Sequence, residues 1–251
     1  MVCGRYVTAS SPALLAERLH VDEIRIPDAE VEPNYNVTPR TEVPVVAERI
    51  SDDGDRLRVL DRVRWGLVPS WAKDLSVGDR LINARSEGIA EKPAYRKAFE
   101  RRRCLMPADG FYEWRVVPGS TGKRKQKQPY FIARVDREPM AFAGLYEVWR
   151  DRADPDAEWV RSCAIITTAA NDKLAPIHDR MPVVLAETDW QEWLDPEQRD
   201  TTKLARLLVP APSDEFLCYP VSTLVNKPDN QGPELLDEVA EATVGEPGMF
   251  N

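Results

Sequence analysis

A cysteine near the amino terminus, Cys3, is followed by Gly4 and Arg5. If Cys3 were the first residue, its α-amine and thiol would form a 1,2-aminothiol, whose spacing closes a five-membered ring on an aldehyde. The amine has an ordinary pKa of roughly 7.7 to 8, whereas the thiol, at roughly 8.5, needs nearby positive charge to ionise. Arg5 could supply that charge. Alternatively, Cys3 is a small apolar residue that begins a β-strand. Taken alone, residues 1–6 favour this second interpretation.

Two further residues have the character of proton-transfer groups. Glu113 is flanked by Tyr112 and Trp114, and an aromatic setting raises the pKa of a carboxyl toward neutrality. Alternatively, the two-residue period of a strand sends Glu113 to solvent. His178 lies between two prolines and is followed by Asp179, so a rigid loop would present an imidazole beside a partner that can fix its tautomer.

A third group suits an anionic ligand. If residues 81–88 are extended, Asn83, Arg85 and Glu87 point to the same side. Trp71 stands where a strand gives way to a loop, and it could stack on single-stranded nucleic acid or fold back as a lid on the core. The extended segment 33–39 offers neutral hydrogen-bonding groups, and it is either a ligand-binding segment or a connector.

Composition limits the class of protein. The chain has 251 residues, 43% of them apolar, which fits one large domain or two small ones. No apolar run of 18 residues and no leader is present, so we expect a soluble, cytoplasmic protein. The net charge of −8 argues against coating nucleic acid by bulk attraction, but basic clusters at 96–103 and 123–127 leave room for a local groove.

Metal and cofactor chemistry is not predicted. The four cysteines have no C-x-x-C spacing, and neither of the two histidines stands near a cysteine at metal-ligand spacing. Phosphate-binding loops, dinucleotide fingerprints and nucleophile elbows are missing from the sequence. Three of the cysteines lie in or beside apolar strand-like runs, where a buried inert thiol is common: Cys104, Cys163 and Cys218.

Strands dominate the predicted elements. Residues 43–50 and 57–68 read as strands joined by a turn at 51–54, and further strands are expected at 130–135, 140–149, 161–169 and 216–221. Short helices are expected from Pro12 after a Ser10 or Ser11 cap, from Pro93, and at 188–194 and 201–208. Because helices and strands do not alternate regularly, the predicted class is α+β with mostly antiparallel pairing.

Six motifs, in order, resemble the SRAP family, the SOS-response-associated peptidases that shield abasic sites. They are residues 3–6 (CGRY), 35–39 (YNVTP), 65–69 (WGLVP), 82–87 (INARSE), 110–114 (GFYEW) and 177–182 (IHDRMP). The resemblance implies one compact domain with a barrel-like sheet and flanking helices. We place that domain at residues 1–225, followed by a partly ordered acidic tail at 226–251.

The resemblance also implies a function in the DNA damage response. The terminal cysteine would capture the aldehyde of an abasic site in single-stranded DNA as a thiazolidine, a lyase-like Schiff-base reaction, with peptidase activity limited to autoprocessing. Cys3, Asn83, Glu113 and His178 would be the catalytic residues. Single-stranded DNA would be the partner, bound by a monomer that associates with the nucleoid, and the DNA-binding residues would be Arg5, Asn36, Pro39, Trp71, Arg85, Ser86 and Arg180.

One position departs from the family pattern. Val2 stands between the initiator methionine and Cys3, so removal of Met1 alone would leave the amine of Cys3 blocked. Capture therefore requires loss of both residues, by self-processing or by another peptidase, or a different translation start. Two other functions stay open: a Cys/His thiol peptidase acting on proteins, and a non-catalytic module that binds single-stranded DNA.

Overall fold

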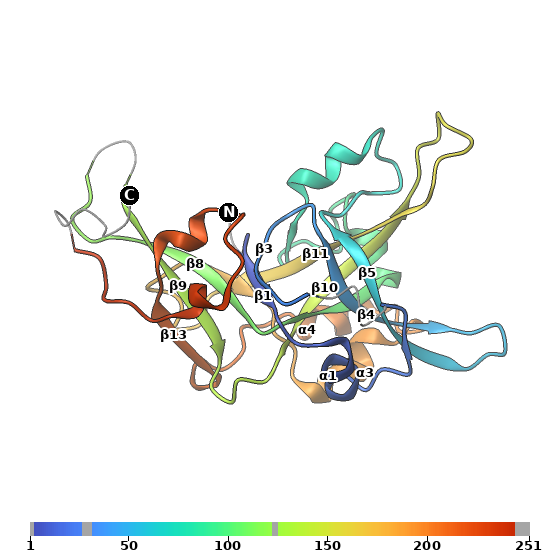
Figure 1. The fold of residues 1–251 in the computed structure, drawn as a ribbon. Helices are drawn as coiled ribbons and strands as arrows, with labels where there is room; N and C mark the ends of the chain where they lie inside the picture. The colour runs from blue at the N-terminus through green and yellow to red at the C-terminus, as the bar shows by residue number, and fades with distance from the viewer. Residues whose placement is uncertain (1–2, 27–31, 122–124, 244–251) are drawn as a thin grey trace.

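Two β-sheets pack face to face in the computed structural model, which describes residues 3–26, 32–121 and 125–243. The smaller sheet holds β1, β3, β8, β9 and β13, and lies to the left in Figure 1. Its strands run in the order β13 (Phe216–Pro220), β9 (Lys127–Arg134), β8 (Gly110–Val116), β1 (Tyr6–Thr8) and β3 (Asn34–Val37).

The larger sheet curls back toward itself. Its order is β12 (Arg180–Pro182), β11 (Val160–Ala169), β10 (Met140–Trp149), β7 (Arg103–Ala108), β4 (Glu42–Ile50), β5 (Arg56–Trp65) and β2 (Glu23–Ile24). A short parallel pairing joins β5 to β11, and β6 (Asn83–Arg85) also pairs with β11. The other pairings are antiparallel except β2 with β5. The sheet is thus barrel-like without being a closed barrel.

Four helices in the described ranges cover the outer face of the larger sheet: α1 (Pro12–Arg18), α2 (Arg96–Arg101), α3 (Glu187–Leu194) and α4 (Thr201–Arg206). Leu15, Phe99 and Trp193 from these helices share one apolar cluster with Leu60 and Leu105 of the sheet. The predicted cap is confirmed, since the Ser11 hydroxyl accepts the Leu14 N–H at 3.3 Å. Figure 1 shows α1, α3 and α4 together below the larger sheet. The predicted α+β class, mostly antiparallel and in one compact domain, is confirmed.

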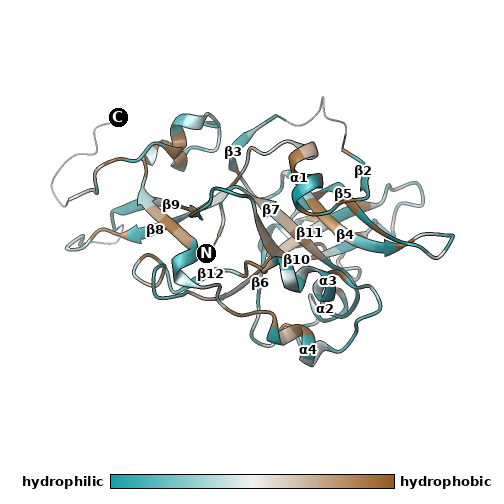
Figure 2. Ribbon diagram, turned by 90° about the horizontal axis from the view of Figure 1, so that it is seen from below, coloured by the Kyte–Doolittle hydropathy of each residue, from teal (hydrophilic) through white to brown (hydrophobic). Residues whose placement is uncertain are grey.

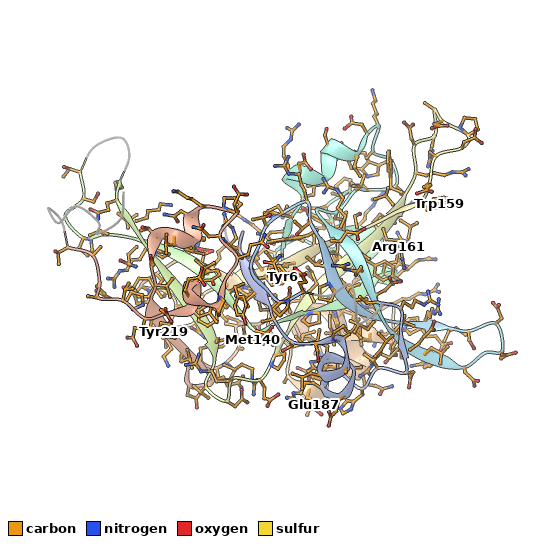
Figure 3. The ribbon with its side chains drawn as sticks, in the orientation of Figure 1. Tyr6, Met140, Trp159, Arg161, Glu187 and Tyr219 are labelled. Atoms are coloured by element: carbon orange, nitrogen blue, oxygen red, sulfur yellow. The ribbon has the colours of Figure 1, made fainter. Side chains whose placement is uncertain are left out.

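Aromatic side chains fill the space between the sheets. The Tyr6 ring lies 5.1 Å from Trp65 and 6.1 Å from Phe142, edge-on in both cases, and Phe142 also contacts Phe111. All four side chains are fully buried, and Figure 3 shows Tyr6 at the centre of the molecule. Truncating a buried aromatic ring costs about 3 to 5 kcal/mol. This cluster therefore fixes β1 firmly, three residues after Cys3.

The outer face of the smaller sheet is covered by the C-terminal segment, which begins after β13 and is drawn in red over β8 and β9 in Figure 1. Val225 and Leu235 are fully buried there against Tyr112 and Phe131. Short 3₁₀ helices organise this and other connections: η2 (Leu75–Arg80), η3 (Ser213–Glu215), η4 (Thr223–Asn226) and η5 (Pro233–Leu236). The boundary at residue 225 stays a prediction. Residues 226–243 pack on the domain, and the last eight residues of the predicted tail lie outside the described ranges.

Hydropathy follows these layers. In Figure 2 the apolar colour concentrates on the strands and the polar colour on the connecting loops. Among the described residues, no helix is both long enough and apolar enough to cross a membrane.

Candidate active site

The register of two neighbouring strands brings Cys3 to Glu113. Tyr6 of β1 lies opposite Phe111 of β8, and the strands are antiparallel, so the residues before Tyr6 run beside the residues after Phe111. Cys3 adopts a left-handed backbone conformation, with φ of 43°. Its backbone N–H donates a hydrogen bond to Glu113 Oε1 at 2.6 Å. The nitrogen that would become the α-amine is therefore already in contact with the predicted proton-transfer group.

Glu113 is buried, with 4% of its surface exposed. Burial raises the pKa of its carboxyl to about 7, and the backbone N–H groups of Cys3 and Trp114 oppose this rise. The carboxyl can therefore give and take a proton near neutral pH, as the aromatic neighbours predicted. The alternative that Glu113 faces solvent is wrong.

The Cys3 thiol has no exposed surface and belongs to the cluster between the sheets. Burial, and secondly the charge of Glu113, raise the pKa of the thiol well above its ordinary value. The sequence-based expectation that Arg5 activates this thiol is wrong, because the Arg5 guanidinium is used elsewhere. Its Nη1 donates to Asn36 Oδ1 and to the Val225 carbonyl oxygen, each at 2.7 Å. The raised pKa favours the protonated form of this thiol at neutral pH.

His178 is partly buried, and burial lowers the pKa of its imidazole while Asp179 opposes this. Nδ1 accepts the Arg180 backbone N–H at 3.1 Å and also lies 2.8 Å from Asp179 Oδ1. One nitrogen cannot accept the first bond and donate the second at once. The lowered pKa favours a neutral ring whose Nδ1 accepts from Arg180, since Asp179 is largely exposed to competing water. A neutral ring that accepts at Nδ1 carries its hydrogen on Nε2.

A small pocket joins the carboxyl to the imidazole. Glu113 and His178 both line it, together with Arg180 and four apolar side chains, Phe111, Ile132, Leu174 and Ile177. The apolar walls and the burial of Glu113 lower the dielectric around its carboxyl, which strengthens the electrostatic interactions that the carboxyl makes. The structure thus brings Cys3, Glu113 and His178 together from the segment before β1, from β8 and from the loop before β12.

Polar residues at the end of β6 lie beside this pocket. The Thr167 carbonyl oxygen accepts the Ser86 N–H at 2.8 Å and Arg180 Nη2 at 2.7 Å, and Arg85 pairs with Thr167 across the strands. Arg180 also binds both carboxylate oxygens of Glu87 at 2.9 Å, which lowers the pKa of Glu87 to about 2. Arg85 is exposed and Ser86 is half-buried. The sequence analysis did not identify Thr167, whose carbonyl oxygen holds both Ser86 and Arg180.

Asn83 begins β6 and is half-buried. It pairs with Ile165 of β11, and its carbonyl oxygen accepts the Tyr95 hydroxyl at 3.0 Å. Asn83 is therefore held on the same short strand as Arg85, two residues away, as the alternation predicted. Glu87, expected on the same face, lies beyond the end of the strand and pairs with Arg180.

Asn36 has a structural role in place of the predicted DNA contact. Its side chain is 1% exposed. Its Nδ2 donates to three carbonyl oxygens of the C-terminal segment, those of Val225, Lys227 and Asn230, at 2.8 to 3.2 Å. Together with the bonds of Arg5, these contacts tie β3 and β1 to that segment. Pro39 follows β3 and is half-buried, so its contact with DNA stays a prediction.

Trp71 is 57% exposed on the loop after β5, and is not a core lid. The loop turns at Gly66, where φ is +129° and an added Cβ would lie 2.8 Å from the Gly78 carbonyl oxygen, so only glycine fits. Trp71 Nε1 donates to the Pro93 carbonyl oxygen at 3.4 Å. The ring is thus available for stacking.

In the described part of the chain, no group of three His, Cys, Asp or Glu side chains could hold a metal ion.

This fold and site define a compact α+β protein with a buried cysteine and carboxyl, a partly buried imidazole and surface arginines nearby. The chain belongs to the SOS response associated peptidase (SRAP) family, whose profile matches residues 2–228. It is 40% identical over 236 residues to the abasic site processing protein YoqW of Bacillus subtilis, covering 94% of this chain and 99% of that one.

More distant relatives carry similar names. The abasic site processing protein YedK of Escherichia coli is 34% identical, over 95% of this chain and all of its own length. HMCES of Rattus norvegicus, also named an abasic site processing protein, is 32% identical over 81% of this chain and 64% of its own. A solved structure from Bacteroides thetaiotaomicron has the same fold, with a TM-score of 0.80 at 24% identity, covering 95% of this chain and 100% of that one.

Proposed function

We propose that this protein captures abasic sites in single-stranded DNA as a covalent adduct of Cys3. The single observation that carries the proposal is the 2.6 Å hydrogen bond between the Cys3 nitrogen and a carboxyl whose pKa is about 7. The names of the relatives, which describe processing of abasic sites, support the choice of substrate.

The first step frees the amine of Cys3. Hydrolysis of the Val2–Cys3 peptide bond adds hydroxide to the carbonyl carbon of Val2 and a proton to the departing nitrogen. Glu113 contacts that nitrogen and is half protonated near pH 7, so it can supply the proton.

The second step joins protein to DNA. The free amine adds to the aldehyde carbon of the opened sugar, and the resulting carbinolamine loses water when Glu113 protonates its hydroxyl, which gives an imine. The thiol then adds to the imine carbon, and its proton passes to the nitrogen, which closes a thiazolidine ring. A positive iminium beside the sulfur lowers the pKa of the thiol, so ionisation is favoured only once the imine exists. Ring closure is intramolecular, which removes several kcal/mol of entropic cost.

The neighbouring residues would orient the DNA. His178, neutral and with a hydrogen on Nε2, would exchange a proton with the sugar oxygens during ring opening. Asn83 would hold the sugar, and Arg85, Ser86 and Arg180 would bind phosphates. Trp71 would stack on a base beside the lesion.

The alternative functions have less support. A thiol peptidase attacks with a thiolate, but the pKa of the Cys3 thiol is raised well above its ordinary value. Capture of an aldehyde begins instead with the amine. A non-catalytic binding module would not need a buried carboxyl at the Cys3 nitrogen, which costs stability when it ionises.

Replacing Cys3 by alanine tests the proposal. An oligonucleotide with one abasic site is mixed with each protein and run on a denaturing gel, while affinity is measured with a non-reactive abasic analogue. The wild type should give an adduct that survives denaturation, and Cys3→Ala should lose it while keeping affinity within about threefold. Cys218→Ala is the matched control, because Cys218 is a half-buried cysteine on β13. An adduct that persists in Cys3→Ala would refute the proposal.

A further inference from the structure

A groove separate from the pocket beside Cys3 lies where the loop after β5 meets α2 and the β10–β11 hairpin. It is lined by Ser70, Trp149 and Trp159 and by charged residues of both signs. An adjoining hollow shares Ser70, Lys97 and Glu147 with it and reaches Trp71. Figure 3 shows Trp159 at the periphery, at the base of the hairpin, well away from Tyr6 at the centre. The groove therefore begins at Trp71 and ends at Trp159.

The charge of this groove opposes that of the whole chain. The chain carries a net charge of −8, whereas five cationic and two acidic side chains line the part of the groove that reaches Trp159, a local net charge of +3. Both acids are paired: Glu147 Oε2 accepts Arg102 Nη2 at 2.8 Å, and Glu100 lies 3.3 Å from Arg101. The remaining cations are Lys97, Arg150 and Arg152, and all three are exposed.

Two exposed tryptophans mark the ends of the groove. Trp159 is 62% exposed and Trp71 is 57% exposed, more than any other large apolar side chain in the described residues. The Arg150 guanidinium lies 4.8 Å from the centre of the Trp159 ring, so a cation stacks with the aromatic ring beside open surface. Aromatic rings interleaved with arginines stack unpaired bases and neutralise their phosphates. The acids at the hairpin tip, Asp154, Asp156 and Glu158, do not line the groove.

A series of contacts connects the groove to the pocket beside Cys3. Arg180, which lines the pocket, binds Glu87, and Lys92 Nζ donates to the Glu87 carbonyl oxygen at 3.2 Å. Pro93 follows Lys92 in the sequence, and its carbonyl oxygen accepts the Trp71 indole N–H. Glu87, Lys92, Pro93 and Trp71 are all exposed, so these contacts run along the surface.

We infer that the groove from Trp71 to Trp159 binds the unpaired DNA strand that flanks the abasic site, with a base on Trp159 and phosphates on Lys97, Arg150 and Arg152. This inference rests on the proposed function for the position of the abasic site. An unpaired strand is favoured over a duplex because the exposed rings offer stacking faces, which only unstacked bases can use. The protein would then distinguish a lesion in extended single-stranded DNA from one on a short fragment.

The test measures affinity as a function of flank length. The probes carry a non-reactive abasic analogue with flanks of about 2 or about 12 nucleotides on either side, within the range of single-strand site sizes. For the wild type, lengthening the flank on one side should tighten binding at least fivefold. Trp159→Ala and Arg150→Glu should lose that gain, and Arg150→Glu should also show a weaker salt dependence. Arg206→Glu, an exposed arginine on α4 with the same change in charge, should keep the gain.

Two outcomes would overturn the inference: both groove variants keep the gain from the long flank, or a flank annealed to its complement tightens binding more than the unpaired flank. A separate assay keeps the proposed function distinct. Cross-linking of a short reactive oligonucleotide at saturating concentration should be the same in Trp159→Ala and wild type. A wild type that forms no cross-link would refute the proposed function, whereas equal flank dependence in all variants would refute only the groove.

Discussion

Replacing Glu113 by glutamine should slow covalent capture and at the same time stabilise the fold. Glutamine keeps the size of the side chain and an oxygen that can accept the Cys3 N–H, now 2.6 Å from Oε1. It cannot transfer a proton. General acid–base catalysis by one side chain is worth about 10² to 10⁴-fold, so the cross-linking rate should fall by that range. The inflection near pH 7 in the wild-type rate profile should disappear.

The stability change follows from linkage. The pKa of Glu113 rises from 4.5 to about 7 on folding, so the folded state binds this proton more tightly than the unfolded state. Its contribution to stability is full below pH 4.5 and is lost as the pH rises through 7. At 1.36 kcal/mol for each tenfold change in affinity, the loss is about 3 kcal/mol. Glu113→Gln should avoid that loss and be more stable than wild type at pH 8.

Two assays separate these effects. Rates are measured by denaturing gels from pH 5.5 to 9, with both proteins produced to begin at Cys3, so that processing does not limit the reaction. Stability is measured by urea unfolding in a Cys3→Ala background, in which no adduct can form. A Glu113→Gln variant that cross-links at the wild-type rate, or that is less stable than its parent at pH 8, would refute the role of the buried carboxyl.

Three more perturbations test the neighbouring residues. Asn36→Ala should lower the free energy of urea unfolding by about 2 to 4 kcal/mol, because three carbonyl oxygens of the C-terminal segment lose the Asn36 amide as their donor. A change below about 0.5 kcal/mol would contradict the structural role of Asn36. His178→Gln should slow cross-linking by about 10²-fold at pH 7 without changing affinity for the abasic analogue by more than about threefold. Glu87→Gln should release the Arg180 guanidinium for phosphate and tighten binding about fivefold at low salt, as followed by fluorescence anisotropy; unchanged affinity would contradict this role.

The strands could be predicted where local pattern alone sets them. Alternation and the turn at residues 51–54 gave β4 and β5, and apolar runs gave β10 and β11. Their ends were harder to place. The strand expected to reach Val68 ends at Trp65, because Gly66 takes a left-handed conformation against the backbone of Gly78.

The site needed information that local pattern does not contain. A two-residue period could not decide whether Glu113 is inside or outside, because β8 is covered on one face by the larger sheet and on the other by the C-terminal segment. Arg5 and Asn36 looked free to bind DNA, yet their partners are 189 to 220 residues away in the sequence, at Val225. The order of motifs indicated which residues belong together. Only the fold showed which of them already form hydrogen bonds with other parts of the chain.

Intact mass spectrometry of the protein, alone and after mixing with single-stranded DNA that bears one abasic site, tests the central claim most directly. We expect a chain that has lost Met1 and Val2, and a denaturation-resistant adduct whose mass is that of protein plus DNA minus one water. Peptide mapping should locate the adduct at Cys3. A chain that keeps both residues and forms no adduct, or an adduct on any other residue, would contradict it.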